Sequence, residues 1–208
     1  MLASSKCIKV LETGSYSLSP DCTQFIVDGL SHSTSLEKLV MNHSNFSSEN
    51  VLSLASVLRV NTTLKELDVE YCNIQSRDSV HLAKALEKNN ATQLQTLSLY
   101  NNPIGSEGAV AFASMLATSK NLTELDLNHC SVGGKGALAL ANMLKRNQCL
   151  KTLWLSDDTV SVEGALNLVE SLRWNTTLEI LWLSTKCKPP SFSTLDTGLQ
   201  ERVTFYSY

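Results

Sequence analysis

Residues 122–149 read LTELDLNHCSVGGKGALALANMLKRNQC, and related phrases recur along the chain. The phrase begins with three leucines spaced L-x-x-L-x-L, passes through a glycine-rich turn and ends in an amphipathic helical pattern. Copies begin at Leu64, Leu94 and Leu150. A period of 20–50 residues is the signature of stacked supersecondary units, so this repeat decides the architecture.

The repeats extend over almost all of the 208 residues. Clear copies begin at Leu36, Leu64, Leu94, Leu122, Leu150 and Leu178, and a weaker one begins near Ile8. Their spacing is 28 residues, except for 30 between Leu64 and Leu94, where extra residues lie around positions 89–93. The last copy loses register at residues 186–190. We therefore predict one repeat domain over residues 1–208 with a degenerate final unit.

Each unit is predicted to contain one strand and one helix. Apolar residues alternate across Leu125 and Leu127, which is typical of a short strand with one buried face. Leu138, Ala141 and Leu144 are predicted to form the helix stripe that faces the strand. A small residue nine positions into a unit should fill space or form hydrogen bonds under the turn, at Cys72, Asn102, Cys130 and Asp158.

One such unit cannot bury its apolar face alone, so neighbouring units must stack into a solenoid. The pattern L-x-x-L-x-L-x-x-[C/N]-x-[I/V], followed by G-x-x-x-L-A-x-x-L, resembles the leucine-rich repeats of the ribonuclease-inhibitor subfamily. That subfamily also forms the C-terminal repeats of NOD-like receptors. The resemblance covers about residues 8–185 and implies an α/β leucine-rich repeat solenoid, a right-handed horseshoe segment. Parallel strands would line its concave face and helices its convex face.

Composition and charge narrow the functional classes. The net charge is −3 and basic residues are not clustered, which argues against binding to nucleic acid or anionic membranes. No apolar run is long enough to span a membrane, and the N-terminal residues lack the apolar segment of a signal peptide. Cys72 and Cys130 occupy one repeat slot and are expected to be buried thiols. These features predict a cytoplasmic protein.

The sequence contains no motif for catalysis. A phosphate-binding loop, a nucleophile elbow and a zinc-protease motif are all absent, and no metal or cofactor site is predicted. Ran GTPase-activating proteins share this repeat type, and they rely on a loop arginine, a loop asparagine and a very acidic C-terminal tail. This sequence has no such tail, and Arg77 is the one arginine in its strand-to-helix turns. We therefore predict that the protein is not an enzyme.

Strand alternation predicts which residues point away from the helices. The middle outward position is occupied by Val40, Asp68, Ser98, Asp126, Trp154 and Trp182. The next outward position is occupied by Asn42, Glu70, Tyr100, Asn128, Ser156 and Ser184. One residue further along are His43, Tyr71, Asn101, His129, Asp157 and Thr185. These rows define the candidate binding surface.

Two features of this surface suggest a protein partner. Trp154 and Trp182 fall side by side on adjacent strands, and tryptophan is enriched at binding hot spots. The other interpretation is that the C-terminal segment folds over both rings. Acidic residues on the same face would steer a basic partner, or would only keep the sheet solvated. The candidate protein-binding residues are Trp154, Trp182, Tyr100, Tyr71, Asp68, Glu70, Asp126 and His129.

The predicted function is a protein-interaction scaffold. It would resemble the ligand-sensing or autoinhibitory repeats of cytosolic NOD-like innate immune receptors. The alternatives are a GTPase-activating protein of the Ran type and a ribonuclease-inhibitor-like regulator, although the six cysteines are fewer than that inhibitor carries. The weak first unit and the ending ERVTFYSY are interpreted as improvised caps, so self-association through exposed solenoid ends is also expected.

Overall fold

The computed structural model describes residues 7–14, 17–156 and 159–207. Asp157, Asp158 and residues 1–6, on which some of the expectations above rest, lie outside these ranges. Within them one eight-stranded sheet has the order β1 to β8, and every neighbouring pair is parallel. The strands are β1 (Val10–Glu12), β2 (Lys38–Val40), β3 (Glu66–Asp68), β4 (Thr96–Ser98), β5 (Glu124–Asp126), β6 (Thr152–Leu155), β7 (Ile180–Ser184) and β8 (Val203–Tyr206).

A helix follows each strand from β1 to β6. These helices are α1 (Pro20–Ser31), α2 (Ser48–Leu58), α3 (Ser76–Lys88), α4 (Gly105–Thr118), α5 (Gly133–Leu144) and α6 (Val162–Ser171). Two 3-10 turns, η2 (Thr185–Cys187) and η3 (Pro190–Thr194), and the short helix α7 (Thr197–Glu201) connect β7 to β8. The alternation confirms the predicted α/β solenoid. The degenerate final unit stays a prediction. None of the helices in the described ranges is long and apolar enough to cross a membrane.

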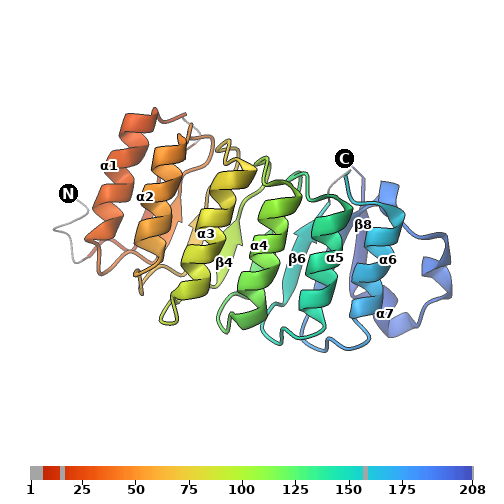
Figure 1. The fold of residues 1–208 in the computed structure, drawn as a ribbon. Coiled ribbons are helices and arrows are strands. Elements are labelled where there is room, and N and C mark those ends of the chain that lie inside the picture. Colours follow the sequence, from red (N-terminus) through yellow and green to blue (C-terminus); the bar gives the residue numbers. More distant parts are fainter. Residues whose placement is uncertain (1–6, 15–16, 157–158, 208) are drawn as a thin grey trace.

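Helices α1–α6 stand in a row over one face of the sheet (Figure 1). Paired strands lie about 4.8 Å apart, whereas packed helices need 8–10 Å. The helix layer therefore spans a longer arc than the strand layer, and the opposite face of the sheet is the concave one. We call that opposite face the strand face.

The middle leucine of each repeat sets the strand register. Leu39, Leu67, Leu97, Leu125, Leu153 and Leu181 pair in one continuous row, which Leu11 extends to β1 and Val203 to β8. From Leu39 to Leu181 these side chains are no more than 2% exposed. Full burial of a leucine contributes about 1.5–3 kcal/mol, and a slip by one residue would expose the whole row. The leucine row thus fixes which residues reach the strand face.

The buried stripe of α5 differs in phase from the predicted one. Ala137, Leu140, Ala141 and Leu144 are buried, whereas Leu138 is 48% exposed. The prediction that Leu138 faces the strand was wrong. Because the buried positions run i, i+3, i+4 and i+7 from Ala137, Leu138 falls about 100° around the helix, toward solvent.

The small-residue slot works as predicted. The Asn102 side chain accepts hydrogen bonds from the backbone N–H groups of Cys72 (3.0 Å) and Ile74 (2.9 Å), and donates to the carbonyl of Val69 (2.8 Å). The thiols of Cys72 and Cys130 each donate to a carbonyl of the preceding repeat at 3.1 Å. Both cysteines are 0% exposed, and burial raises the pKa of Cys72 to about 12. The Cys72 thiol is therefore neutral, and both cysteines are buried packing groups, as expected.

A second recurring slot carries buried asparagines where one repeat passes into the next. The Asn175 amide donates to the carbonyls of Leu144 and Asn147, each at 2.8 Å, and its oxygen accepts from the backbone N–H of Leu178 at 2.7 Å. Asn147 and Asn89 make similar bonds one and three repeats earlier. Asn175 belongs to an N-x-[S/T] sequence but is 0% exposed, so its role is in the repeat junction.

Arg202 closes this asparagine ladder at the C-terminal end. Its guanidinium donates to the carbonyls of Leu178 (2.7 Å), Asn175 (2.8 Å) and Leu172 (3.1 Å). Its own backbone carbonyl accepts from the N–H of Leu181 at 2.8 Å. Arg202 therefore ties β8 to the last complete repeat.

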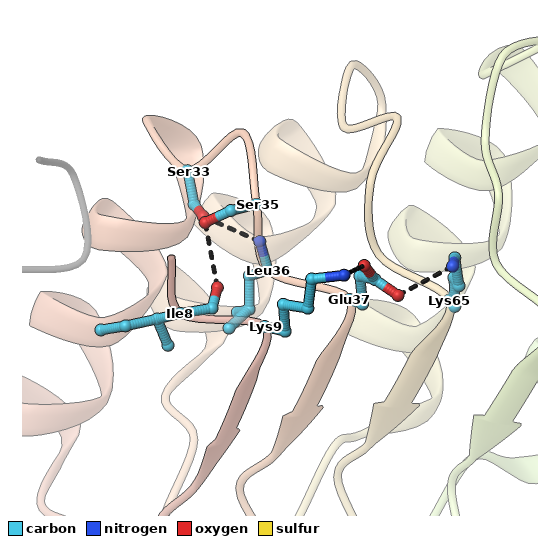
Figure 2. Close-up of polar contacts among 7 residues, drawn as sticks. All are labelled: Ile8, Lys9, Ser33, Ser35, Leu36, Glu37 and Lys65. Carbon is cyan, nitrogen blue, oxygen red and sulfur yellow. Dashed lines mark hydrogen bonds and ion pairs between the residues drawn. The ribbon is translucent and has the colours of Figure 1, made fainter. Parts of the chain in front are cut away.

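The weak first unit joins the sheet through polar contacts near the start of its strand. Figure 2 shows the Glu37 carboxylate between the Lys9 ammonium (2.9 Å) and the Lys65 ammonium (2.7 Å). Hydrogen bonds from Lys65 and Lys9 lower the pKa of Glu37 to about 2. The Ser35 hydroxyl donates to the carbonyl of Ile8 at 3.0 Å. The segment that begins near Ile8 therefore contributes a strand, β1, and a helix, α1, to the solenoid.

Candidate functional site

The middle outward positions form one row across the strand face. Asp68, Ser98, Asp126, Trp154 and Trp182 are register partners in successive strands from β3 to β7. Each of these residues is half-buried, while the leucines beside them are buried against the helices. The alternation therefore oriented this row correctly.

A hollow of about 430 Å³ opens over the C-terminal half of the row. We call it the strand-face hollow, and it is lined by Glu70, Tyr100, Asp126, Asn128, Trp154, Trp182 and Tyr206. Five of these were candidate binding residues from the sequence. Asn128 and Tyr206 were not, and the other three candidates lie outside the lining: Asp68, Tyr71 and His129.

The rings of Trp154, Trp182 and Tyr206 line the hollow on its β6–β8 side, which we call the aromatic wall. Trp154 and Trp182 sit directly opposite each other in the β6–β7 register. The C-terminal segment does not fold over them, because β8 extends the sheet beside β7 and places Thr204 opposite Trp182. The Tyr206 ring lies 5.9 Å from the Trp182 ring, at 56° between planes. The segment interpreted as a cap thus adds a ring to the site.

The carboxylates of Glu70 and Asp126 line the hollow on its β3–β5 side, which we call the acidic wall. The Asp126 carboxylate accepts a hydrogen bond from the backbone N–H of Asn128 at 2.8 Å. Burial, with a smaller effect from the nearby charges of Glu70 and Asp68, raises the pKa of Asp126 to about 7, although the hydrogen bond from Asn128 acts to lower it. Asp126 therefore changes its charge near neutral pH.

Two further acidic residues belong to the neighbouring repeat: Asp68 lies on β3 and Glu70 lies in the turn after it. The Ser98 hydroxyl donates to Glu70 Oε1 at 2.7 Å, and the Asn42 amide donates to Asp68 Oδ2 at 3.1 Å. Burial raises the pKa of both carboxyls. Among the seven residues that line the hollow there is no lysine or arginine, so the negative charge of its carboxylates has no cationic partner within the lining.

A ladder of stacked rings borders the hollow at the ends of the strands. The His43 ring stacks on Tyr71 with centroids 4.5 Å apart, Tyr71 lies 5.1 Å from Tyr100, and Tyr100 meets His129 edge-on at 5.4 Å. Three of these residues have positive φ angles, 59° at His43, 54° at Tyr71 and 53° at His129. Such a backbone is uncommon for residues other than glycine, so packing must hold it in place.

The second outward row matches its prediction only in part. Asn42, Glu70 and Tyr100 are half-buried, but Asn128, Ser156 and Ser184 are buried. The reason is visible at Asn128, whose side-chain oxygen accepts from the backbone N–H of Ser156 at 2.6 Å. The side chains of Asn128 and Ser184 accept from backbone N–H groups where the strands end, a role that alternation alone does not predict.

Outside the strand face, the structure offers little for chemistry. No group of three or more histidine, cysteine, aspartate or glutamate side chains within the described ranges is arranged to hold a metal ion. Trp174 is 60% exposed, follows α6 and has the Lys145 ammonium 5.5 Å from its ring centroid. This third tryptophan is separate from the hollow.

The fold and its repeats define the class of protein, a leucine-rich repeat solenoid. The Leucine Rich repeat family model matches residues 60–78, 90–113 and 118–141. This match is to leucine-rich repeats in general and does not single out the ribonuclease-inhibitor subfamily or the NOD-like receptors. No curated protein matches the sequence.

Among the solved structures that share this fold are two from leiomodin and tropomodulin. Leiomodin-1 Actin-Binding Site 2 is 21% identical with a TM-score of 0.60, over 72% of this chain and 86% of that one. The tropomodulin C-terminal domain from Caenorhabditis elegans is 16% identical with a TM-score of 0.60, over 74% of this chain and 92% of that one. At these identities the similarity establishes the fold alone.

Proposed function

We propose that the protein is a non-enzymatic interaction module that binds a protein partner on its strand face, centred on the strand-face hollow. One observation carries the proposal: the register places Trp154 and Trp182 together in a hollow with the carboxylates of Asp126 and Glu70. Tyrosine and tryptophan supply large contact areas with little loss of side-chain entropy.

The hollow is suited to binding because strands hold its walls. Trp154, Trp182 and Asp126 all lie within strands whose leucines are buried, so binding requires little ordering of the backbone. A preformed site loses less conformational entropy on binding than a mobile loop does. Tyr100 and the two tryptophans serve as anchors in this proposal.

Charge sets the kind of partner. Asp68, Glu70 and Asp126 favour a basic partner surface and disfavour nucleic acid or anionic lipid. Tyr71 and His129 extend the contact surface along the ring ladder. The acidic residues orient the partner, and the rings provide most of the binding free energy.

The finer role that we propose follows the resemblance to NOD-like receptor repeats. In that role the module senses a ligand, or holds a receptor inactive, in the cytoplasm. Actin is a specific partner to test, because the leiomodin-1 structure with this fold is named for an actin-binding site. Co-sedimentation with actin filaments separates actin binding from the receptor-like role, because a module that recognises another ligand stays in the supernatant.

The two alternatives have their own tests. A ribonuclease-inhibitor-like regulator would bind a basic ribonuclease in a salt-dependent manner and reduce its activity. A GTPase-activating protein of the Ran type would raise GTP hydrolysis by its partner, with Arg77 as the candidate arginine. Arg77 lies on α3, outside the hollow lining, so an activity that depends on Arg77 and not on Trp154 would favour this alternative.

Affinity capture with matched variants tests the main proposal. The wild-type chain, Trp154→Ala/Trp182→Ala and the control Trp174→Ala are each used to capture proteins from cytosolic extract. We expect a partner that the wild type and Trp174→Ala retain and the double variant loses. Thermal unfolding checks that the double variant is folded. Equal retention by all three chains would contradict binding at the hollow.

A further inference from the structure

We infer that the strand-face hollow is a binding site for a guanidinium group, so that the partner inserts an arginine side chain between its aromatic and acidic walls. This inference rests on the proposed function and specifies what the partner must present. It follows from the lining, which combines two features that together recognise a planar cation.

The aromatic wall supplies faces for a cation. Trp154 and Trp182 are neighbours in register, and Tyr206 lies against Trp182. Tyr100, in the turn after β4, adds a ring between the strands of Glu70 and Asp126. A cation within about 6 Å of an aromatic centroid is attracted by the ring, most strongly by tryptophan. The rings also exclude water from one side of the ligand, which strengthens its attraction to the carboxylates.

The acidic wall supplies hydrogen-bond acceptors. Asp126 Oδ1 accepts from the Asn128 N–H at 2.8 Å, and Glu70 Oε1 accepts from the Ser98 hydroxyl at 2.7 Å. A carboxylate has about four acceptor sites, so these bonds orient each group without exhausting it. The two carboxylates therefore remain able to accept N–H groups from a ligand in the hollow.

Arginine fits this pair of walls better than lysine does. A guanidinium stacks flat on an aromatic ring while its edge donates to carboxylates, and it is more weakly hydrated than an ammonium group. A metal ion is a poorer match, since the lining offers rings and two carboxylates, and no metal cluster occurs within the described ranges. Phosphates and other anions are excluded by the charge of the hollow.

The three tryptophans provide the readout for a direct test. The full chain is titrated with acetyl-arginine methylamide, and the indole N–H signals of Trp154, Trp182 and Trp174 are followed by NMR. Acetyl-citrulline methylamide, a neutral ligand of nearly the same shape, is the matched control, and acetyl-lysine methylamide tests the shape of the cation. We expect saturable shifts of Trp154 and Trp182 with the arginine probe, weaker binding of the lysine probe and no response to citrulline. Trp174 should not respond.

Variants connect the response to the acidic wall. Glu70→Gln/Asp126→Asn should weaken binding of the arginine probe by roughly tenfold, because it removes charge and keeps the shape of the hollow. Glu124 lies on β5, as Asp126 does, but outside the lining of the hollow. Glu124→Gln should therefore leave binding of the arginine probe unchanged. Undisturbed backbone spectra show that each variant is folded.

Each contrary result has a distinct meaning. Equal shifts with the arginine and citrulline probes, or no shift of Trp154 and Trp182, would overturn the guanidinium site. If partner capture still depends on the two tryptophans in that case, the proposed function stands without it. If capture is insensitive to them, the proposed function fails whether or not the hollow accepts arginine.

Discussion

Asp126 is the residue whose charge the proposed site uses and folding disfavours. Its pKa is raised from 3.8 to about 7 in the folded chain, chiefly by burial, so the folded protein favours the neutral carboxyl. Below about pH 4 both the folded and the unfolded chain carry the proton on Asp126. The contribution of its raised pKa to the free energy of unfolding is then fully present. As the pH rises toward and through about 7 the contribution is lost, because the unfolded chain has already released its proton.

The first prediction concerns this pH dependence. Asp126→Asn stays neutral at every pH and can keep the acceptor bond to Asn128. We expect it to raise the free energy of unfolding at pH 8 by on the order of 1–2 kcal/mol and to have little effect at pH 4. Urea unfolding at the two pH values measures both, with Glu124→Gln as the control. An equal loss of stability at both pH values would contradict the account.

The second prediction concerns a glycine at the helix interface. A Cβ atom at Gly136 would lie 2.8 Å from Ala109 Cβ on α4 and 2.8 Å from Val132 Cγ1. Gly136→Ala should therefore destabilise the protein by about 1–3 kcal/mol through overpacking. Gly134 is the matched control, because its Cβ would lie 3.8 Å from the nearest atom, Ser161 Oγ.

Gly134→Ala should stabilise α5 by up to about 1 kcal/mol, since alanine favours the helix and nothing crowds it. Thermal or urea unfolding compares the two variants. If both substitutions change stability in the same direction by the same amount, the close approach of α4 and α5 is not what requires a glycine at position 136.

At the scale of elements, the Arg202 side chain supports the short strand β8 in addition to its pairing with β7. It contains four residues, and Arg202 immediately before it donates to carbonyls at the end of the asparagine ladder. Burial lowers the pKa of Arg202, which indicates that its charge is partly removed from water. Hydrogen bonds to a charged donor are the stronger kind, so this clamp should decide whether β8 stays paired.

The third prediction follows from that clamp. Arg202→Ala should cost about 1–3 kcal/mol of stability and expose the amides of residues 203–206 to hydrogen exchange. Arg173→Ala is the control, because Arg173 is exposed and pairs with Glu170 on the surface, where such pairs contribute about 0–1 kcal/mol. Unchanged protection of residues 203–206 in Arg202→Ala would show that strand pairing alone holds β8.

The sequence predicted what the repeat period determines. The leucine row, the small-residue slot at Cys72 and Asn102, and the orientation of Trp154 all follow from a pattern repeated many times. Prediction from the sequence failed where the orientation of a side chain depends on local geometry. The phase of α5 left Leu138 exposed, and Asn128 turned its amide to the backbone of the next strand.

Five of the seven residues that line the hollow were predicted from the sequence. Trp154, Trp182, Tyr100, Glu70 and Asp126 came from strand alternation, but Tyr206 lies beyond the last recognisable repeat. The alternating residues VTFY at positions 203–206 are typical of a strand, but we interpreted this segment as a cap. Tertiary pairing with β7, rather than a repeat motif, brings Tyr206 to Trp182.

At the scale of the whole molecule, the solenoid presents an acidic strand face from a chain of net charge −3. The fourth prediction is that association with a basic partner slows as salt rises, because the Debye length falls from about 10 Å at 0.1 M to about 3 Å at 1 M. Stopped-flow mixing measures the association rate constant over this range. Glu70→Gln/Asp126→Asn should flatten the dependence, whereas an unchanged salt slope would contradict steering by these carboxylates.

The open ends of the sheet support the expectation of self-association, which stays a prediction. In the described ranges β1 and β8 each pair with one neighbour only, and unpaired strand edges favour intermolecular pairing. Sedimentation over a range of concentrations tests this expectation, and Arg202→Ala should alter the result if β8 is the edge that associates.

Side-chain footprinting of the protein with its captured partner tests the central claim most directly. Hydroxyl-radical oxidation of Trp154, Trp182 and Tyr206 is compared with and without the partner, and Trp174 serves as the internal reference. We predict that the partner protects the three residues of the hollow and leaves Trp174 as reactive as before. Protection of exposed residues on the helix face, such as Leu138, with Trp154 and Trp182 unchanged, would contradict binding at the strand face.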